Sequence, residues 1–211
     1  MADDGRTMLS YDQIMAVQTG TMAGEYRGVP MLKNPFDLAL YTRLIGELRP
    51  TTIIEIGSHR GGSALWFADQ LRCHGITGAV HSIDLAQVGD VNDPMVTFHG
   101  ADARALAPLL ATLAPLPHPW LVVEDADHMA ITTRAVLDFF HPLLRLGDWL
   151  VVEDGILTAM GVAADYGGGP LCAIDGFLGE HGAQYKLRRD YCDWFGRNVT
   201  WNVDGWLERV A

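Results

Sequence analysis

Apolar positions follow two alternating spacings along the chain, and this pattern predicts an α/β fold. From residue 35 onward, short continuous apolar runs alternate with stretches whose apolar residues recur every three or four positions. The short runs are typical of buried parallel strands, and the spaced stretches are typical of amphipathic helices. The predicted strands cover 51–57, 79–85, 96–99, 120–125 and 149–154, and the predicted helices cover 37–48, 61–71, 102–113 and 131–144. This alternation indicates an open, mostly parallel sheet with helices on both faces.

The first part of the chain, residues 1–34, lacks this regular alternation. It contains one short predicted helix, 11–18, followed by a turn-rich segment with three glycines and two threonines between Thr19 and Gly28. We therefore expect residues 1–34 to form an arm or lid on a single domain that spans residues 35–211.

The last part of the chain also departs from the alternation. A glycine-rich, irregular stretch at 157–170 precedes a short predicted helix at 173–178. The tail then predicts two further strands, 185–190 and 200–210. Two terminal strands that form an antiparallel hairpin at the sheet edge would complete the seven-stranded, Rossmann-like sheet of class I methyltransferases, whereas a dehydrogenase more often continues the parallel pattern.

Composition and charge exclude several classes of protein. The 211 residues fit one domain with a sizeable core, and no Lys/Arg cluster accompanies the net charge of −11, which argues against a nucleic-acid partner. No apolar run reaches the roughly 18 residues of a transmembrane helix. The polar start of the chain has no apolar signal core. We therefore expect a cytoplasmic protein without a membrane partner, whose three widely spaced cysteines stay reduced.

A glycine-rich turn follows the first predicted strand, where ligands bind in such sheets. Its spacing, Gly57-x-x-x-Gly61, departs from the Gly-x-Gly-x-x-Gly fingerprint of dinucleotide sites. The preceding acid, Glu55, suits a cationic ligand such as a methionine amino group or a sulfonium. Ser63 is placed either to cap the next helix or to bond the ligand, and an ordinary strand–helix turn is the alternative interpretation. The candidate cofactor residues here are Glu55, Gly57, Ser58, Gly61, Gly62 and Ser63.

Two further acids lie where a nucleoside would bind. Asp84 ends the second predicted strand, and a carboxylate at that point can accept both ribose hydroxyl protons. Asp102 follows the third strand, where an adenine amino group is often met. Each has an alternative role as a helix cap, and for Asp102 the two roles are compatible.

The fourth and fifth strands end in the same sequence, Val-Val-Glu-Asp. Because parallel neighbours end at the same edge of a sheet, Asp125, Glu153 and Asp154 should lie close together, with Asp125 also near the cofactor. Clustered carboxylates raise each other's pKa values, and a hard cation such as Mg²⁺ removes that conflict. Solvated acids or helix caps are the alternative.

Candidates for removing a proton from the acceptor follow the fourth strand. His128 is either a general base or a structural residue that orients Asp125. Asp127 is a second candidate, although it also fits a cap before the helix at 131. The candidate catalytic residues are therefore His128, Asp127 and Asp125.

At these residues the sequence resembles the cephalosporin hydroxylase/rhamnosyl O-methyltransferase group of class I S-adenosylmethionine (SAM)-dependent methyltransferases. The resemblance covers nearly the whole chain after about residue 26. The motifs that carry it are Gly28-Val-Pro-Met-Leu-Lys33, Glu55-Ile-Gly57, Arg60-Gly-Gly-Ser63, Asp125-Ala-Asp-His128, Leu150-Val-Val-Glu-Asp154, Gly169-Pro170 and Thr200-Trp-Asn-Val-Asp-Gly-Trp-Leu207.

The resemblance implies a metal and a methyl donor. In that group an acid at the end of strand four and a pair at the end of strand five hold a divalent metal, and the matching residues are Asp125, Glu153 and Asp154. Glu55, Gly57 and Asp84 match the cofactor positions. The resemblance also implies a sugar or antibiotic hydroxyl as acceptor, a place in secondary metabolism and a homo-oligomer.

Together these observations predict a SAM-dependent, divalent-metal-assisted O-methyltransferase that acts on a small molecule. N-methylation on the same scaffold is an alternative. A nicotinamide-dependent oxidoreductase fits the glycine spacing and the tail less well. A non-catalytic binding subunit would be expected to have lost the acidic cluster, which is intact here.

Overall fold

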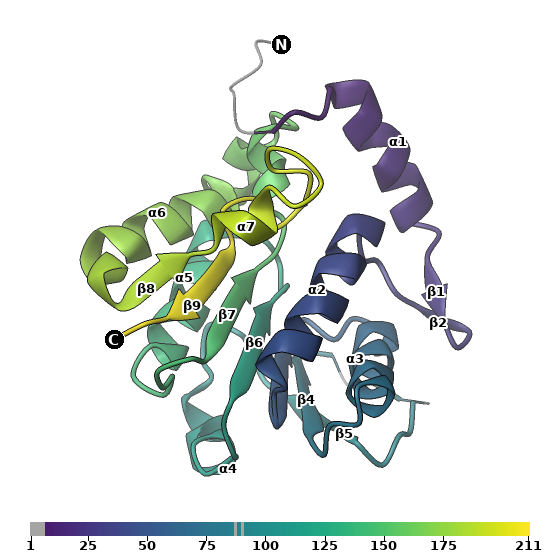
Figure 1. Cartoon of the computed structure of the whole chain (residues 1–211), viewed down its shortest axis with the longest axis vertical. Helices are drawn as coiled ribbons and strands as arrows, with labels where there is room; N and C mark the ends of the chain where they lie inside the picture. The colour runs from purple at the N-terminus through teal and green to yellow at the C-terminus, as the bar shows by residue number, and fades with distance from the viewer. Residues whose placement is uncertain (1–6, 87, 90) are drawn as a thin grey trace.

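A seven-stranded sheet forms the centre of the molecule (Figure 1). The computed structural model describes residues 7–86, 88–89 and 91–211, so the polar start at residues 1–6 lies outside the described residues. The strand order is β5-β4-β3-β6-β7-β9-β8. The strands are β3 (Thr52–Ile56), β4 (Ala79–Asp84), β5 (Val96–Gly100), β6 (Trp120–Glu124), β7 (Trp149–Val152), β8 (Tyr185–Leu187) and β9 (Trp206–Arg209).

The direction of the strands confirms the predicted sheet. The five strands from β5 to β7 pair in parallel, whereas β9 pairs antiparallel with both β7 and β8. The parallel part places the carboxyl ends of β3, β4, β6 and β7 along one edge. This is the seven-stranded sheet of class I methyltransferases, with the antiparallel hairpin at its C-terminal end.

Helices cover both faces of the sheet, because the strands are apolar on both sides. One face packs against α5 (Ala130–Phe140) and α6 (Gly169–His181), and its core includes Ile54, Val122 and Leu150. The other face packs against α2 (Pro35–Leu48) and α3 (Gly62–Cys73), and its core includes the alternate strand residues, such as Val123 and Val151. Alternate side chains of a strand point to opposite faces, which decides the direction of each polar residue at a strand end.

The N-terminal segment lies over the carboxyl edge of the sheet (Figure 1). Helix α1 (Tyr11–Thr21) begins at a capping box formed by Ser10 and Gln13 and extends three residues beyond the predicted end. A two-stranded hairpin, β1 (Glu25–Tyr26) and β2 (Val29–Pro30), follows it. The hairpin contacts α3 through the Tyr26 hydroxyl, which donates a hydrogen bond of 2.8 Å to the Asp69 carboxylate.

The predicted helix over 102–113 is wrong in extent. The structure has a turn at Asp102, a 3₁₀ segment at Ala107–Leu109 and a single helical turn, α4 (Leu110–Leu113). Pro108 lacks a backbone donor and fits only the first turn of a helix, so a continuous helix through it is disfavoured.

The predicted strands of the tail are also too long, in part because of a long-range contact. Strand β8 stops at Leu187, where α7 (Arg189–Cys192) begins, and β9 starts only at Trp206. The Asp37 carboxylate accepts hydrogen bonds from the Thr200 hydroxyl and from the Trp201 N–H, so this segment is held by a side chain rather than by a strand ladder.

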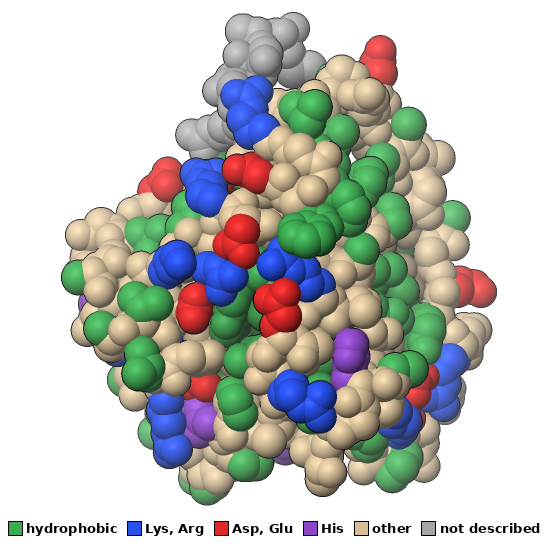
Figure 2. Space-filling view, in the orientation of Figure 1, with side chains coloured by type: hydrophobic (Ala, Val, Ile, Leu, Met, Phe, Trp, Pro, Cys, Tyr) green, Lys and Arg blue, Asp and Glu red, His purple; other side chains and the backbone are tan. Residues whose placement is uncertain are grey.

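The outer surface mixes both signs of charge. Basic and acidic side chains are interspersed on the face shown in Figure 2, around α2 and α7. Arg43 pairs with Glu47, and Arg188 pairs with Asp190 and Glu208. In the described part of the chain, no helix is both long and apolar enough to cross a membrane.

Candidate active site

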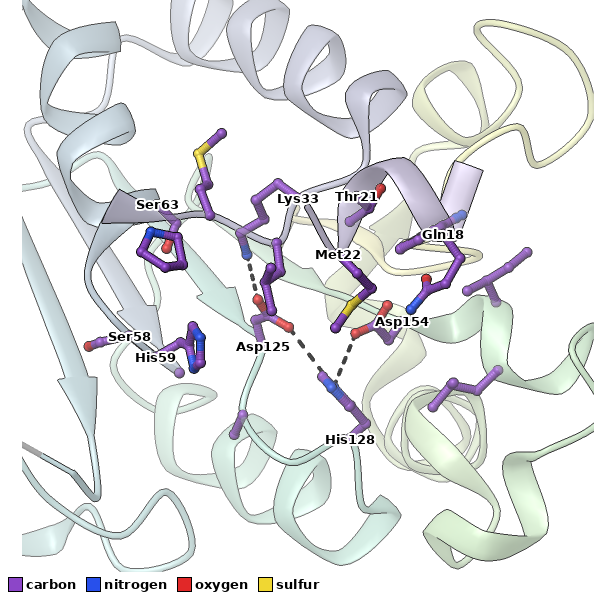
Figure 3. Close-up of a pocket in the computed structure, with 18 of the residues that line it drawn as sticks. Gln18, Thr21, Met22, Lys33, Ser58, His59, Ser63, Asp125, His128 and Asp154 are labelled. Atoms are coloured by element: carbon purple, nitrogen blue, oxygen red, sulfur yellow. Dashed lines mark hydrogen bonds and ion pairs between the residues drawn. The ribbon is translucent and has the colours of Figure 1, made fainter. Parts of the chain in front are cut away.

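A cavity of about 390 Å³ opens at the carboxyl edge of the sheet, beneath α1 (Figure 3). Its lining comes from the last turn of α1, the segment between β2 and α2, the glycine turn after β3, the ends of β4, β6 and β7, the segment after β7, and Trp201. The polar residues among its lining are Gln18, Thr21, Lys33, Ser58, His59, Ser63, Asp84, Asp125, His128, Asp154 and Tyr166.

The glycine turn depends on close backbone contacts. Gly57 has φ +104°, and a Cβ on it would lie 1.9 Å from the carbonyl oxygen of Asp125. Only glycine therefore lets the ends of β3 and β6 approach so closely. A Cβ on Gly62 would lie 2.3 Å from the Pro30 carbonyl oxygen, so the neighbour that Gly62 accommodates is the N-terminal segment. Gly61, with φ +89°, occupies the N-cap of α3 and offers no side-chain cap, and the Ser63 hydroxyl donates to the Glu55 carboxylate.

Glu55 lies beneath this turn, fully buried, and is not part of the cavity wall. The Ser82 hydroxyl donates to its carboxylate, and the Ser58 and Ser82 hydroxyls are 2.6 Å apart. Burial raises the pKa of Glu55, while the charge of Lys33 opposes that increase. The structure therefore places Glu55 where it supports the turn from below.

Asp84 stands where the cavity meets a second one of about 210 Å³. Its carboxylate accepts hydrogen bonds from the backbone N–H groups of His59 (2.8 Å) and Ala86 (2.9 Å). Asp102 and Arg104 line the second cavity. Asp102 accepts from the backbone and side chain of Arg104, which lowers its pKa, so it holds a turn and does not cap a helix.

Asp125, His128 and Asp154 come together in the main cavity (Figure 3). One ligand atom from each lies within 4.8 Å of the others. The His128 Nδ1 is 3.1 Å from Asp154 Oδ2 and 3.9 Å from Asp125 Oδ1. His128 (φ 59°) and Asp154 (φ 58°) both adopt left-handed backbone conformations, which non-glycine residues adopt only when the surroundings hold them there. Such strain is often found at functional sites.

Glu153 faces away from this group of three. Its Oε1 accepts hydrogen bonds from the Lys33 Nζ (2.6 Å) and from the Tyr41 hydroxyl (2.8 Å). The Lys33 Nζ also lies 2.6 Å from Asp125 Oδ2. Glu153 does not contribute to the wall of the cavity, although Asp125 and Asp154 do.

The protonation equilibria reflect this crowding. Burial is the largest effect on Asp125 and Asp154 and raises both pKa values, although Lys33 and His128 oppose it. Burial and the charge of Asp125 raise the pKa of Glu153 to about 7. Burial alone would lower the pKa of His128, but the neighbouring Asp154 and Asp125 raise it. Two carboxylates and an imidazole in this arrangement fit a divalent cation, which would relieve the repulsion between the acids.

Asp127 is held by the turn before α5. Its carboxylate accepts hydrogen bonds from the Met129 N–H and from the Thr132 hydroxyl, each with a donor–acceptor distance of 3.0 Å. It lines the second cavity, on the side of Asp102, and Met129 occupies the N-cap position of α5. The catalytic role considered for Asp127 stays a prediction.

Several residues of the site were not identified from the sequence. Gln18, Thr21 and Met22 reach the cavity from α1, whose weak periodicity gave no indication of a site. The ring of Tyr41 is buried in the core, but its hydroxyl reaches Glu153. Lys33 had a signal that could have been used: it is one of only two lysines in the chain and lies in an apolar segment.

The sheet and the cavity at its carboxyl edge define a class I SAM-dependent methyltransferase. The family model described as "Rhamnosyl O-methyltransferase/CmcI" matches residues 19–210. This chain therefore belongs to the rhamnosyl O-methyltransferase/CmcI family, and it is a methyltransferase.

Individual relatives agree with this assignment. The rhamnosyl O-methyltransferase of Mycobacterium leprae is 32% identical over 167 residues, which cover 76% of this chain and 73% of the relative. That of Mycobacterium tuberculosis strain H37Rv is 30% identical over 168 residues, or 76% and 69% of the two chains. A structure of CmcI described as its Mg-SAM form is 27% identical, with a TM-score of 0.73 over 90% of this chain and 78% of CmcI. The methyltransferase MycE, at 18% identity and TM-score 0.52 over 68% and 40% of the two chains, shares the fold.

Proposed function

We propose that this protein transfers the methyl group of SAM to a hydroxyl of a small molecule, with the assistance of a divalent cation. The observation that carries the proposal is the convergence of Asp125, His128 and Asp154 in a cavity that also contains the glycine turn and Asp84. A methyl donor and a metal would thus be bound side by side. Orientation of two reactants in this way contributes much of the catalysis in transfer reactions.

The donor is proposed to span the two adjoining cavities. The turn at Gly57 and Ser58 would receive its methionine part, and Asp84 would accept hydrogen bonds from the ribose hydroxyls. The second cavity, beside Asp102 and Arg104, has the volume and position for the adenine. Solved structures of the related CmcI are described with Mg and SAM and with S-adenosylhomocysteine, which supports SAM as the donor.

The cation is proposed to bind between Asp125 and Asp154, with Glu153 as a further ligand and His128 beside it as the base. When bound, it supplies a Lewis acid that lowers the pKa of a neighbouring hydroxyl. His128 is in reach of that position and, with its pKa raised by Asp154 and Asp125, would accept the acceptor's proton. Helix α1 and the segment after β7 line the same space.

The acceptor is proposed to occupy the part of the cavity nearest α1. Its wall there combines apolar side chains, Met22, Leu157 and Met160, with the polar ends of Gln18 and Tyr166. This combination fits a neutral molecule with an apolar body and a few hydroxyls. A sugar or antibiotic hydroxyl fits that description, and the names of the mycobacterial relatives favour a rhamnosyl group.

Radiolabelled methyl transfer tests the proposal. The purified protein would be incubated with SAM and a panel of acceptors, neutral glycosides such as phenyl rhamnosides and amines, with Mg²⁺ or with EDTA. Labelled product is expected with Mg²⁺ and is expected to disappear both in EDTA and in the Asp154→Asn variant. Undiminished transfer in EDTA would contradict the metal role, and labelling only of amine acceptors would contradict O-methylation.

A further inference from the structure

Two residues in the wall of the main cavity carry buried polar atoms that have no hydrogen-bond partner among the described residues. The atoms are Nε1 of Trp201 and Oγ1 of Thr21. The two residues are only 5% and 4% exposed. A buried donor without a partner has lost its hydration without compensation, so such groups are rare in folded proteins and call for an explanation.

The indole of Trp201 differs in this respect from two other buried tryptophans. The Trp120 N–H donates to the Leu116 carbonyl with a donor–acceptor distance of 3.3 Å. The Trp206 N–H donates to the Thr200 hydroxyl at 3.4 Å. Neither Trp120 nor Trp206 lines the main cavity, whereas Trp201 does.

The hydroxyl of Thr21 differs in the same way from that of a threonine in the same helix. Thr19 donates to the Met15 carbonyl one turn earlier, at 2.9 Å, which is a common arrangement for threonine in a helix. Thr21 lies in the last turn of α1, which also brings Gln18 to the cavity (Figure 3). In α1, therefore, the threonine that lines the cavity is the one with the unpaired hydroxyl.

The backbone of Trp201 is held on both sides although its indole N–H is not. Its N–H donates to the Asp37 carboxylate at 3.0 Å, and its carbonyl accepts from the Ile156 N–H at 3.0 Å. Ile156 follows the end of β7 and lines the cavity as well. These contacts join the segment before β9 to α2 and to the end of β7, so they fix the position of the indole.

Helix α1 has little buried surface to hold it in place. Ile14 and Thr21 are the only buried residues of α1, and Ile14 belongs to the same apolar cluster as Trp201. Both unpaired atoms are enclosed in this conformation, so a ligand can reach them only when α1 shifts. Segments with few buried contacts are the ones that move at a small cost in free energy.

We propose that Trp201 and Thr21 determine the specificity for the acceptor: after a shift of α1, the indole N–H and the threonine hydroxyl bind two oxygen atoms of the acceptor. This inference rests on the proposed function, since it requires an acceptor at the α1 end of the cavity. The indole only donates, so its partner is a hydroxyl or ether oxygen, whereas the Thr21 hydroxyl donates or accepts. An acceptor that lacks these oxygens leaves both groups unpaired and is rejected.

The inference predicts opposite effects on stability and on binding. Replacing an unpaired buried hydroxyl by a methyl group should preserve or increase the stability of the free protein, and it should weaken binding of the acceptor. Thr52 provides the matched control, because it is equally buried but donates to the Pro117 carbonyl at 2.7 Å. Thr52→Val should therefore lower stability and leave binding of the acceptor unchanged.

Kinetics and urea unfolding of the full chain test this prediction. The KM and kcat for a phenyl rhamnoside would be measured at saturating SAM and Mg²⁺ for Thr21→Val, Trp201→Phe and the controls Thr52→Val and Trp120→Phe. Each of the first two variants is expected to raise KM roughly fivefold, the effect of one lost hydrogen bond, with kcat nearly unchanged. The two controls are expected to keep the wild-type KM, and Thr21→Val is expected to unfold at a urea concentration no lower than that of the wild type.

The indole N–H resonance of Trp201 provides a direct readout of the hydrogen bond. Protein labelled with ¹⁵N would be titrated with the phenyl rhamnoside in the presence of S-adenosylhomocysteine and Mg²⁺. The Trp201 resonance, identified by its absence in Trp201→Phe, is expected to move downfield as the N–H gains a partner. The Trp120 resonance is expected to stay in place, because that N–H is already bonded to Leu116.

Two results would overturn the inference while the proposed function stands. One is a wild-type enzyme that methylates the rhamnoside while neither Thr21→Val nor Trp201→Phe changes KM. The other is a Thr21→Val variant that loses as much stability as Thr52→Val, since its hydroxyl would then have a structural partner. If the folded wild-type protein methylates none of the acceptors, the proposed function itself fails, and this inference fails with it.

Discussion

Strands β6 and β7 end in the same four residues, yet the two ends differ in what their acids contact. In β6 the sequence is Val122 to Asp125, and in β7 it is Val151 to Asp154. The register pairs Val123 with Val151, so the two copies are offset by one residue. Because side chains alternate between faces, residues at the same position of the motif point to opposite sides of the sheet in the two strands.

The offset gives the two glutamates different environments. Glu124 points toward α5, where it accepts hydrogen bonds from the Thr133 hydroxyl and the Ala126 N–H, and burial raises its pKa to about 7. Glu153 points toward α2 and meets Lys33. The aspartates both reach the cavity, but from consecutive positions of the aligned strands. A repeated motif therefore does not imply a repeated role, because register decides the direction of each side chain.

The largest expected effect comes from replacing an acid at one of these two strand ends by its amide. Asp154→Asn should reduce methyl transfer at least about 100-fold, because it removes a proposed cation ligand from the cavity. Glu124→Gln, an acid-to-amide change in the other copy of the motif, removes a carboxylate that faces α5 and should keep most of the activity. Turnover numbers of both variants, measured beside circular dichroism spectra, make the comparison. Equal losses from both changes would contradict the distinction drawn from the register.

A second test moves the ends of β3 and β6 apart. Gly57→Ala places a Cβ against the Asp125 carbonyl oxygen and requires φ near +104°. The free energy of unfolding should fall by about 3 kcal/mol from combined strain and contact. Affinity for S-adenosylhomocysteine should fall as well, since the same turn is proposed to receive the cofactor. Urea titration gives the first value and calorimetry the second, and unchanged affinity would place the cofactor elsewhere.

The free energy of unfolding is expected to depend on pH through Asp37, which is buried near the end of β7. Burial, with the charges of Glu153 and Asp154, raises the pKa of Asp37 to about 8, against hydrogen bonds from Thr200 and Trp201 that lower it. The pKa of Asp37 is higher in the folded state than its unfolded value of 3.8. Asp37 therefore contributes its full stabilisation below pH 3.8, and this stabilisation is lost as the pH rises through about 8. Between pH 6 and 8 the loss should be about 2 kcal/mol.

Asp37→Asn provides the control for this dependence. The amide cannot ionise but can still accept from the Trp201 N–H, so the curve of unfolding free energy against pH should flatten over the same interval. Urea titrations at several pH values would measure it. A variant whose curve is as steep as that of the wild type would assign the dependence to other groups.

The smallest expected effect concerns Asp127, which holds the turn after β6. Asp127→Ala removes the hydrogen bonds from Met129 and Thr132 and should destabilise the protein by about 1 kcal/mol. Thermal unfolding and methyl transfer would be measured together. A large loss of activity in a stable variant would support the catalytic role that the sequence suggested, whereas a loss of stability alone would support the role of a turn residue.

The sequence predicted the sheet better than the site. Strands β6 and β7 could be recognised because each begins with the continuous apolar run Trp-Leu-Val-Val, bounded by Pro or acidic residues, and such runs depend on local pattern. Register is not local, so the one-residue offset between the strand ends was not predictable, and neither was the separation of Glu153 from Asp154. The helix expected over 102–113 failed at Pro108, a local feature that was available.

The N-terminal segment illustrates the other limit. Lys33, Gln18 and Met22 reach the site from outside the regular βα pattern, and their positions depend on where the arm docks. That docking rests on contacts such as Tyr26 with Asp69 and the Pro30 backbone with Gly62, which join parts of the chain far apart in sequence. The sequence pattern predicts an arm but does not indicate which of its residues enter the cavity.

Titration of S-adenosylhomocysteine into the wild-type protein, with Mg²⁺ and then with EDTA, tests the central claim most directly. We predict micromolar binding with Mg²⁺, because the cofactor cavities and the proposed cation site adjoin at Asp84, Gly57 and Asp125. The affinity should change in EDTA if the two sites are coupled through Asp125. The absence of binding in either condition, from a folded sample, would contradict the assignment of these cavities to a methyl donor.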